Sequence, residues 1–264
     1  PDDVASAIFE HWQPRNADDS SPASMPGVVL ALTDRLDSLV GLFAAGHAPR
    51  STADPYGLRR AALGIIQILV DKALDVDLSK AVELAAIEQP IEVTQEVQDQ
   101  VLDFIAGRLR VYLSDQGFAA DVISAVLSEQ ATNPYNALVG VRELSEWVAR
   151  DDWETVLDSF ARCVRITRSE SEHHAIDESL FSEDYESQLF AAYEVAAVKL
   201  DAEGGNVGNF LVHFEPIIPA VTAFFDNVLV NAEDAKVRNN RIALLQAISA
   251  MQSGRADLSE LDNF

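Results

Sequence analysis

Three polar residues near the end of the sequence have the types and spacing for contacts with a nucleic acid. Arg238 and Arg241 lie three positions apart, with Asn240 beside Arg241, inside the acid-free stretch Ala235–Ile242. Residues three apart share one face of a helix. An arginine can bind phosphate oxygens through two parallel donors, and an asparagine amide can pair with a base edge. The triplet predicts phosphate and base contacts, with an ordinary solvated surface as the alternative.

A second pair of cations, Arg59 and Arg60, falls in the first turn of a predicted helix over 54–74. The positive end of the helix dipole disfavours cations there. Something must therefore offset the two charges. Ion pairs on the surface or between segments are one explanation. Contact with a phosphate or with an acidic subunit surface is the other.

The overall charge limits which polyanions the chain can bind. The formal net charge is −24, so binding to a nucleic acid requires local basic patches rather than general attraction. Seven acids and no Lys or Arg lie between Glu170 and Glu186. This composition predicts that 169–184 is an exposed, mobile acidic loop.

No catalytic constellation is evident in the sequence. The five histidines are scattered, no HExxH is present, and no Ser-His-Asp or Cys-His arrangement stands out. The run Gly204–Gly208 lacks the Lys-Ser/Thr ending of a P-loop and is expected to be a tight loop. The adjacent pair His173-His174 is a poor metal site, and Cys163 is expected in the core. We therefore predict neither catalytic nor metal-binding residues in this chain.

The elements that must position these residues are predicted to be helices. Only 12 Gly and 10 Pro occur in 264 residues, 48% of which are apolar, and apolar positions recur at helical spacing. No apolar run is long enough to span a bilayer, so a soluble, all-α protein is expected. The predicted helices cover 4–12, 28–43, 54–74, 95–114, 121–129, 135–149, 153–165, 185–200, 214–230 and 233–252.

Five strings in the chain resemble the β subunit of bacterial-type glycyl-tRNA synthetase, and they occur in the order found in that family. The second string is similar to the family's DPFALRRAALG signature. The strings are ALTDRLDSLVGLF at 31–43, DPYGLRRAALG at 54–64, DFI with GRLR at 103–110, FFDNVLV at 224–230 and RNNR at 238–241.

The resemblance implies two helical subdomains. Residues 1–95 look like the C-terminal part of an HD-type helical domain, and 96–264 look like a DALR-type anticodon-binding bundle. In this family the aminoacylation site, with its ATP and Mg²⁺, belongs to a separate α subunit of an α2β2 heterotetramer. The β subunit holds tRNA-Gly. A location in the cytoplasm or in a plant organelle, without membrane or DNA partners, is implied.

On this basis we expect a tRNA-binding set of seven residues, and no cofactor in this segment. Asp34 occupies the place of the last Asp in metal-dependent HD domains, but the His and His-Asp ligands of that pattern are not in this sequence. Asp34 is therefore a remnant position, and an HD-type phosphohydrolase is an alternative function. A purely structural subunit-interface module is another. The expected tRNA-binding residues are Arg59, Arg60, Arg108, Arg110, Arg238, Asn240 and Arg241.

Overall fold

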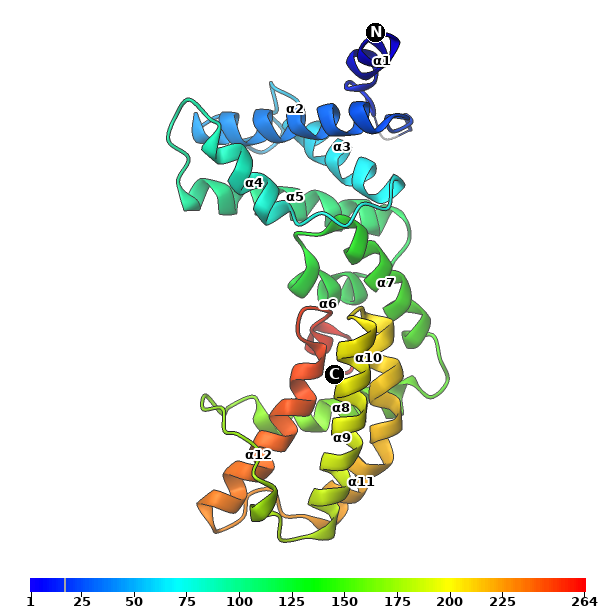
Figure 1. The fold of residues 1–264 in the computed structure, drawn as a ribbon, viewed down its shortest axis with the longest axis vertical. Helices are drawn as coiled ribbons and strands as arrows, with labels where there is room; N and C mark the ends of the chain where they lie inside the picture. The colour runs from blue at the N-terminus through cyan, green and yellow to red at the C-terminus, as the bar shows by residue number, and fades with distance from the viewer. Residues whose placement is uncertain (17) are drawn as a thin grey trace. The chain divides into compact units, whose positions relative to one another are not determined.

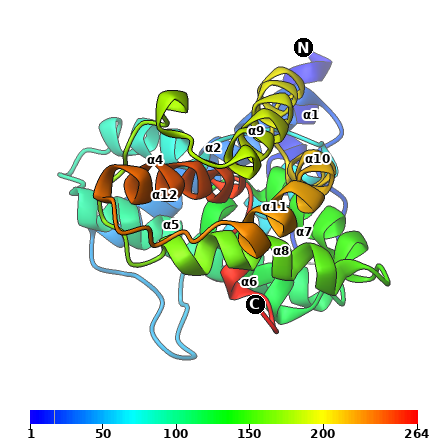
Figure 2. The same ribbon diagram turned by 90° about the horizontal axis from the view of Figure 1, so that it is seen from below.

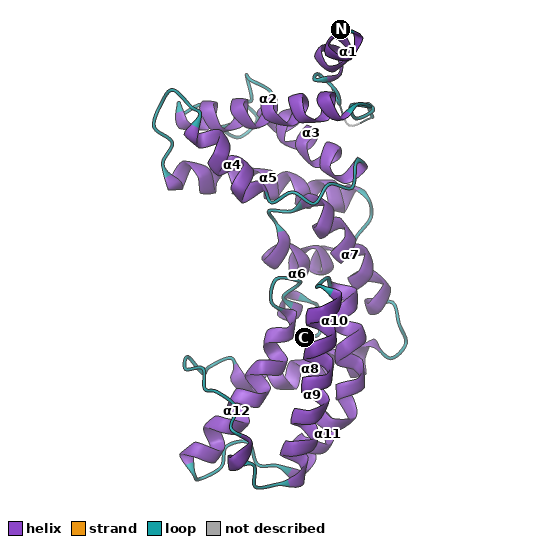
Figure 3. Cartoon of the chain, in the orientation of Figure 1, coloured by secondary structure: helices purple, strands orange, loops and turns teal. Residues whose placement is uncertain are grey.

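The computed structural model describes residues 1–16 and 18–264 and confirms an all-α protein. Helices joined by loops account for the described chain, in which the only strand-like pairing is an isolated bridge between Arg50 and Ala53 (Figure 3). The chain forms two compact units. Unit 1 comprises 1–118 with 130–139, and unit 2 comprises 119–129 with 140–264. The division predicted from the resemblance, between residues 95 and 96, concerns family domains and stays a prediction.

In its described residues, unit 1 contains five helices and the start of a sixth (Figure 1). Helices α2, α3, α4 and α5 pack on one another, and α1 packs on α2. Their buried faces carry aliphatic side chains such as Leu39, Ile65 and Ile105, whose removal from water drives the packing. The helices are α1 (Asp2–Glu10), α2 (Met25–Ala44), α3 (Leu58–Asp71), α4 (Leu78–Ile87), α5 (Gln95–Asp115) and α7 (Pro134–Val148), which continues into unit 2.

Unit 2 has its own core. Helix α8 packs against α11 and α12, and α9 packs against α10 and α11 (Figures 1 and 2). Phe160 of α8 meets Phe210 and Phe214 of α10 edge to face, with ring centroids 5.3 and 5.2 Å apart. The helices are α6 (Ala120–Gln130), α8 (Trp153–Thr167), α9 (Asp184–Glu203), α10 (Val207–Phe214), α11 (Ile218–Asn227) and α12 (Ala235–Ser249).

Several predicted boundaries are corrected by the structure. The helix expected from residue 54 begins at Leu58, because Gly57 adopts a left-handed conformation with φ of 70°. Asp54 still caps it, since its carboxylate accepts the N–H groups of Leu58 and Arg59 at 2.8 and 3.0 Å. Helix α4 was not predicted. The break that Pro216 predicts within 214–230 is confirmed, because a short 3-10 turn at Glu215–Ile217 separates α10 from α11, which ends at Asn227.

The absence of a membrane-length apolar run was also predicted wrongly. Among the described residues, Val207–Asn227 is one stretch that is long and apolar enough to cross a bilayer by composition. Its residues Phe210, Phe214 and Phe224 are fully buried in the core of unit 2, which accounts for the apolar content. Of the loop predicted at Gly204–Gly208, only residues 204–206 lie outside a helix, because Asn206 caps α10 and Val207 and Gly208 belong to that helix. Cys163 is confirmed as a core residue.

Candidate functional site

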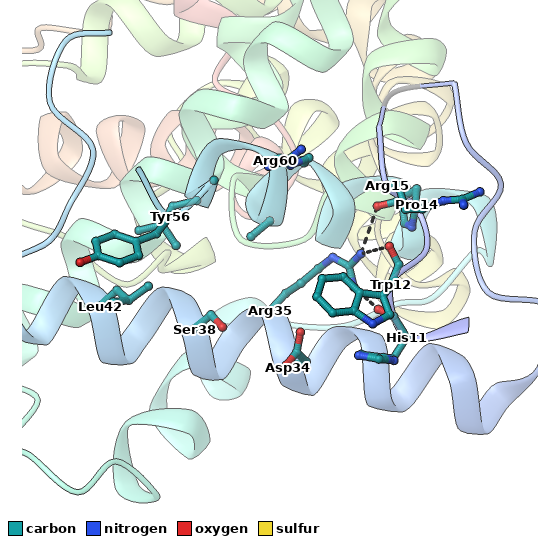
Figure 4. A pocket seen from close by; sticks show the side chains of 13 residues that line it. His11, Trp12, Pro14, Arg15, Asp34, Arg35, Ser38, Leu42, Tyr56 and Arg60 are labelled. Carbon is teal, nitrogen blue, oxygen red and sulfur yellow. Dashed lines mark hydrogen bonds between the residues drawn. The ribbon is translucent and has the colours of Figure 1, made fainter. Parts of the chain in front are cut away.

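Unit 1 contains a pocket of about 520 Å³ whose walls come from three segments. Asp34, Ser38 and Leu42 lie four residues apart along one face of α2 and form one wall (Figure 4). The first turn of α3 and the segment after α1 form the others. The lining residues are His11, Trp12, Pro14, Arg15, Asp34, Arg35, Ser38, Leu42, Tyr56, Gly57, Leu58, Arg60 and Ala61.

Arg35 holds the segment after α1 in place. Its buried guanidinium donates hydrogen bonds of 2.9 to 3.3 Å to five backbone carbonyls, of which four follow α1 and one belongs to α2. Figure 4 shows the Arg35 side chain pointing toward the segment that contains His11, Trp12 and Pro14. Burial lowers the pKa of Arg35, and the neighbouring Asp34 charge partly opposes this. A single side chain thus shapes one wall of the pocket. The acceptors are the carbonyls of His11, Trp12, Gln13, Pro14 and Ala31.

The two arginines at the rim differ in how they are paired. Arg15 is bound by Asp19, with Nε and Oδ2 2.6 Å apart, and hydrogen bonds from Arg15 lower the pKa of that carboxyl. Arg60 is exposed, and within the described chain it has neither an ion pair nor a hydrogen bond. Its guanidinium therefore remains available to an anionic ligand.

Two aromatic side chains at this pocket are largely exposed. Trp12 is 68% and Tyr56 is 53% exposed, and the Tyr56 ring lies 5.3 Å from the ring of His47. Exposed aromatic rings beside an available arginine provide the two contacts that an unstacked nucleotide requires, a stacking surface and a phosphate donor. Sequence reasoning missed both residues, because an apolar residue at helical spacing is usually buried.

Asp34 is in the pocket and is exposed, without an ion pair among the described residues. The described residues contain no group of three or more His, Cys, Asp or Glu side chains placed to hold a metal ion. The lining around Asp34 is mixed and includes Ser38 and two arginines, Arg35 and Arg60. This arrangement favours an anionic ligand over a cation.

Arg59 is used within the loop before α3. Its side chain donates to the carbonyl of Ser51 and lies near the Asp54 carboxylate, with Nη1 and Oδ2 4.0 Å apart. Arg108 and Arg110 flank Leu109, which is on the buried face of α5. Arg108 is half-buried and Arg110 is exposed. In unit 1 the structure thus places only Arg60 of the predicted set in the pocket.

The predicted triplet on α12 is engaged by other parts of unit 2. Arg238 is paired with Glu170 through both guanidinium Nη atoms. The Asn240 amide accepts the N–H of Asp177 at 2.7 Å and donates to its carbonyl at 3.0 Å. Arg241 is buried and paired with Glu186 at 2.9 Å. The acidic segment expected to be a mobile loop is tied to α12 by several of these contacts.

Comparison with known proteins finds similarity to glycine–tRNA ligases. The family model described as "Glycyl-tRNA synthetase beta subunit" matches residues 1–128. The glycine–tRNA ligase β subunit of Persephonella marina is 33% identical over 98% of the chain and 39% of its own length. That of Clostridioides difficile is 35% identical over 98% of the chain and 38% of its length. The chloroplastic/mitochondrial glycine–tRNA ligase 2 of Arabidopsis thaliana is 35% identical over 99% of the chain and 25% of its length.

Proposed function

This chain belongs to the family of glycyl-tRNA synthetase β subunits, and we propose that it binds and positions tRNA-Gly for a glycine–tRNA ligase. It spans about two fifths of the length of the first two bacterial relatives that it matches. In the proposed assembly it contributes to the β half of an α2β2 heterotetramer. The α subunit carries the aminoacylation site with ATP and Mg²⁺, and this segment contributes RNA contacts. The setting is a bacterial cytoplasm or a plant organelle.

The observation that supports RNA binding most directly is the unit 1 pocket. Arg60 supplies an unpaired guanidinium, and Trp12 and Tyr56 supply exposed rings. In the proposed complex an unstacked nucleotide stacks on Trp12 while its phosphate accepts hydrogen bonds from Arg60. Such contacts do not conflict with a strongly acidic protein, because they depend on local rather than total charge.

The remaining predicted RNA contacts are part of the same proposal. Arg108 and Arg110 are proposed to contact the RNA backbone, and Arg59 to hold the loop that presents Arg60 to it. Arg238 and Asn240 are proposed to contact the anticodon arm. Residues 1–95 and 96–264 are proposed as the HD-type and anticodon-binding domains. Arg241 differs from the others because its charge is already matched by a buried carboxylate.

The test uses the full-length β subunit bound to its α partner, with tRNA-Gly affinity measured by filter binding at several salt concentrations. Replacing Arg60 by Ala should remove one phosphate contact, weaken binding, and lower the slope of log affinity against log salt by about 0.7 to 0.9. Replacing Trp12 by Ala should cost about 1 to 3 kcal/mol of binding free energy through lost stacking.

Arg142→Ala is the matched control, because Arg142 is also exposed, has no partner in the described chain, and lies outside the pocket. It should leave the affinity and the salt slope close to those of the wild type. If Arg60→Ala and Trp12→Ala bind tRNA-Gly as tightly as Arg142→Ala does, the pocket is not an RNA site.

A further inference from the structure

Residues 169–183, here called the strap, join α8 to α9 and lie along α12. The strap contains five carboxylates, at Glu170, Glu172, Asp177, Glu178 and Glu183, and no Lys or Arg. It contacts α12 through polar groups at four positions of that helix. These positions are Arg238, Asn240, Arg241 and Gln246, which contact Glu170, Asp177, Ser182 and the carbonyl of Glu172 respectively.

Two of these contacts use the groups that RNA would use. The Glu170 carboxylate faces both Nη atoms of Arg238, which is the two-oxygen arrangement that a phosphate presents to an arginine. The Asp177 peptide offers Asn240 one donor and one acceptor at 2.7 and 3.0 Å. An adenine edge offers an asparagine the same pair through N6 and N7. The strap thus supplies a phosphate-type partner to Arg238 and a base-type partner to Asn240, two residues further along α12.

The strap is not closely packed on the helix that it covers. A hollow of about 290 Å³ lies between them, lined by His173, His174 and Ile176 of the strap and by small residues of α12. Gln246, at the same hollow, donates to the Glu172 carbonyl at 3.0 Å, but its buried Oε1 accepts no hydrogen bond. Gln246 therefore uses only the donor side of its amide against the strap, and an acceptor without a protein partner reduces the stability of the strap's position.

We propose that the strap is an internal substitute for RNA, which occupies Arg238 and Asn240 in the free protein and is displaced from them when tRNA binds. This inference rests on the proposed function. The partly exposed pair of Arg238 and Glu170 is weak enough to exchange for phosphates, whose binding releases counterions. Arg241 stays in place during the exchange, because its partner Glu186 belongs to α9 and not to the strap.

Only part of the strap has to move when it leaves α12. The strap's end is fixed at α9, where the ring of Phe181 lies 5.7 Å from that of Phe190. The segment between Glu170 and Asp177 can therefore leave α12 while the strap remains attached at both ends to unit 2. An RNA displaces the strap only if it places a phosphate at Arg238 and a base at Asn240. The strap therefore lowers the affinity for every RNA, and it lowers it most for RNA that lacks these two groups in the required positions.

The experiment compares Glu170→Gln with Glu178→Gln in the full-length β subunit bound to its α partner. Both variants remove one charge from the strap, but among the described residues the exposed Glu178 side chain has neither a hydrogen bond nor an ion pair with α12. Glu170→Gln should bind tRNA-Gly about fivefold more tightly than Glu178→Gln, the factor that corresponds to an ion pair of about 1 kcal/mol. In a protein that already carries Arg238→Ala, the Glu170→Gln replacement should not increase the affinity for tRNA-Gly, because the arginine that Glu170 occupies is absent.

Hydrogen exchange of the wild-type complex provides a second measurement. The Asp177 N–H, which is bonded to Asn240, should exchange faster when tRNA-Gly saturates the enzyme. Unchanged or slower exchange at Asp177 in an enzyme that binds tRNA-Gly, or equal affinities of Glu170→Gln and Glu178→Gln, would overturn the strap proposal alone. Absence of any tRNA-Gly binding by the wild type would overturn the proposed function and the strap with it.

Discussion

Glu186 of α9 and Arg241 of α12 form a buried ion pair 55 positions apart in the sequence. Oε1 of Glu186 lies 2.9 Å from Nε of Arg241, and the two side chains are 1% and 6% exposed. The carboxylate also accepts the N–H groups of Ser182 and Glu183, and the guanidinium donates to the carbonyl of Leu229. The pair therefore connects α9, α12 and the loop before α12 inside unit 2.

Replacing Arg241 by Ala should lower the free energy of unfolding of the full-length β subunit by about 3 to 5 kcal/mol, because the carboxylate of Glu186 would remain buried without its partner. Urea unfolding followed by circular dichroism measures this. Arg165→Ala is the control, since Arg165 is half-exposed and its pair with Asp158 spans 3.7 Å. Arg165→Ala should lower the free energy of unfolding by less than about 1 kcal/mol. Equal losses in the two variants would contradict the assigned role of Arg241.

The same pair should make stability depend on acid pH. Burial acts to raise the pKa of Glu186, but hydrogen bonds from Arg241 and from the Glu183 and Ser182 backbone outweigh it and lower the pKa below the ordinary 4.5. A lowered folded-state pKa stabilises the protein above the unfolded-state pKa, and this contribution is lost as pH falls through the folded-state pKa. The stability difference between wild type and Glu186→Gln should therefore be largest near neutral pH and shrink below about pH 4.5.

Urea midpoints of the wild type and Glu186→Gln at a series of pH values measure this difference. Other carboxylates that titrate in the same range are common to both proteins and cancel in the comparison. If the stability difference between the two proteins stays constant from neutral to acid pH, the charge of Glu186 does not contribute to stability.

Gly64 and Gly107 should respond in opposite directions to replacement by Ala. A Cβ at Gly64 would lie 2.6 Å from Nε of Arg35, so the guanidinium could make room only by disturbing its hydrogen bonds to five carbonyls. We expect Gly64→Ala to lower the free energy of unfolding by about 1 to 3 kcal/mol. A Cβ at Gly107, in the middle of α5, meets no heavy atom within 4 Å. Gly107→Ala should raise the free energy of unfolding by about 0.5 to 1 kcal/mol, because Ala has a higher helix propensity than Gly.

Thermal or urea unfolding of the two variants checks this prediction, and each variant serves as the control for the other. A Gly64→Ala protein as stable as the wild type would show that Arg35 can leave its carbonyl partners at little cost. The pocket wall formed by the segment after α1 would then not depend on Arg35.

Much of the helical framework could be predicted from local sequence. The spacing of apolar residues in α3 and α5 predicts their helices, and Thr94 predicts the start of α5. Details that depend on backbone conformation could not be predicted in this way. Gly57 moved the start of α3 by adopting a left-handed conformation, and helix α4 has only two buried residues, Leu78 and Val82, to give it a pattern.

The candidate site was less predictable. Arg60 was singled out because its charge opposes the helix dipole, and it is the residue of the predicted set that lines the pocket. Trp12 could not be assigned, because the apolar spacing of residues 4–12 predicts one helix with a buried face, whereas α1 ends at Glu10 and the Trp12 side chain is exposed in the segment that follows.

By itself, the sequence determined the helical class, the acidic character and the family, because apolar spacing, charge and short strings of residues are local properties. Only the tertiary structure decided which arginines are available. The partners of Arg238 and Arg241 lie 68 and 55 positions away, so no local pattern contains them. Whether a guanidinium meets a carboxylate or solvent depends on how distant helices pack, and that packing separates the unpaired Arg60 from the buried Arg241.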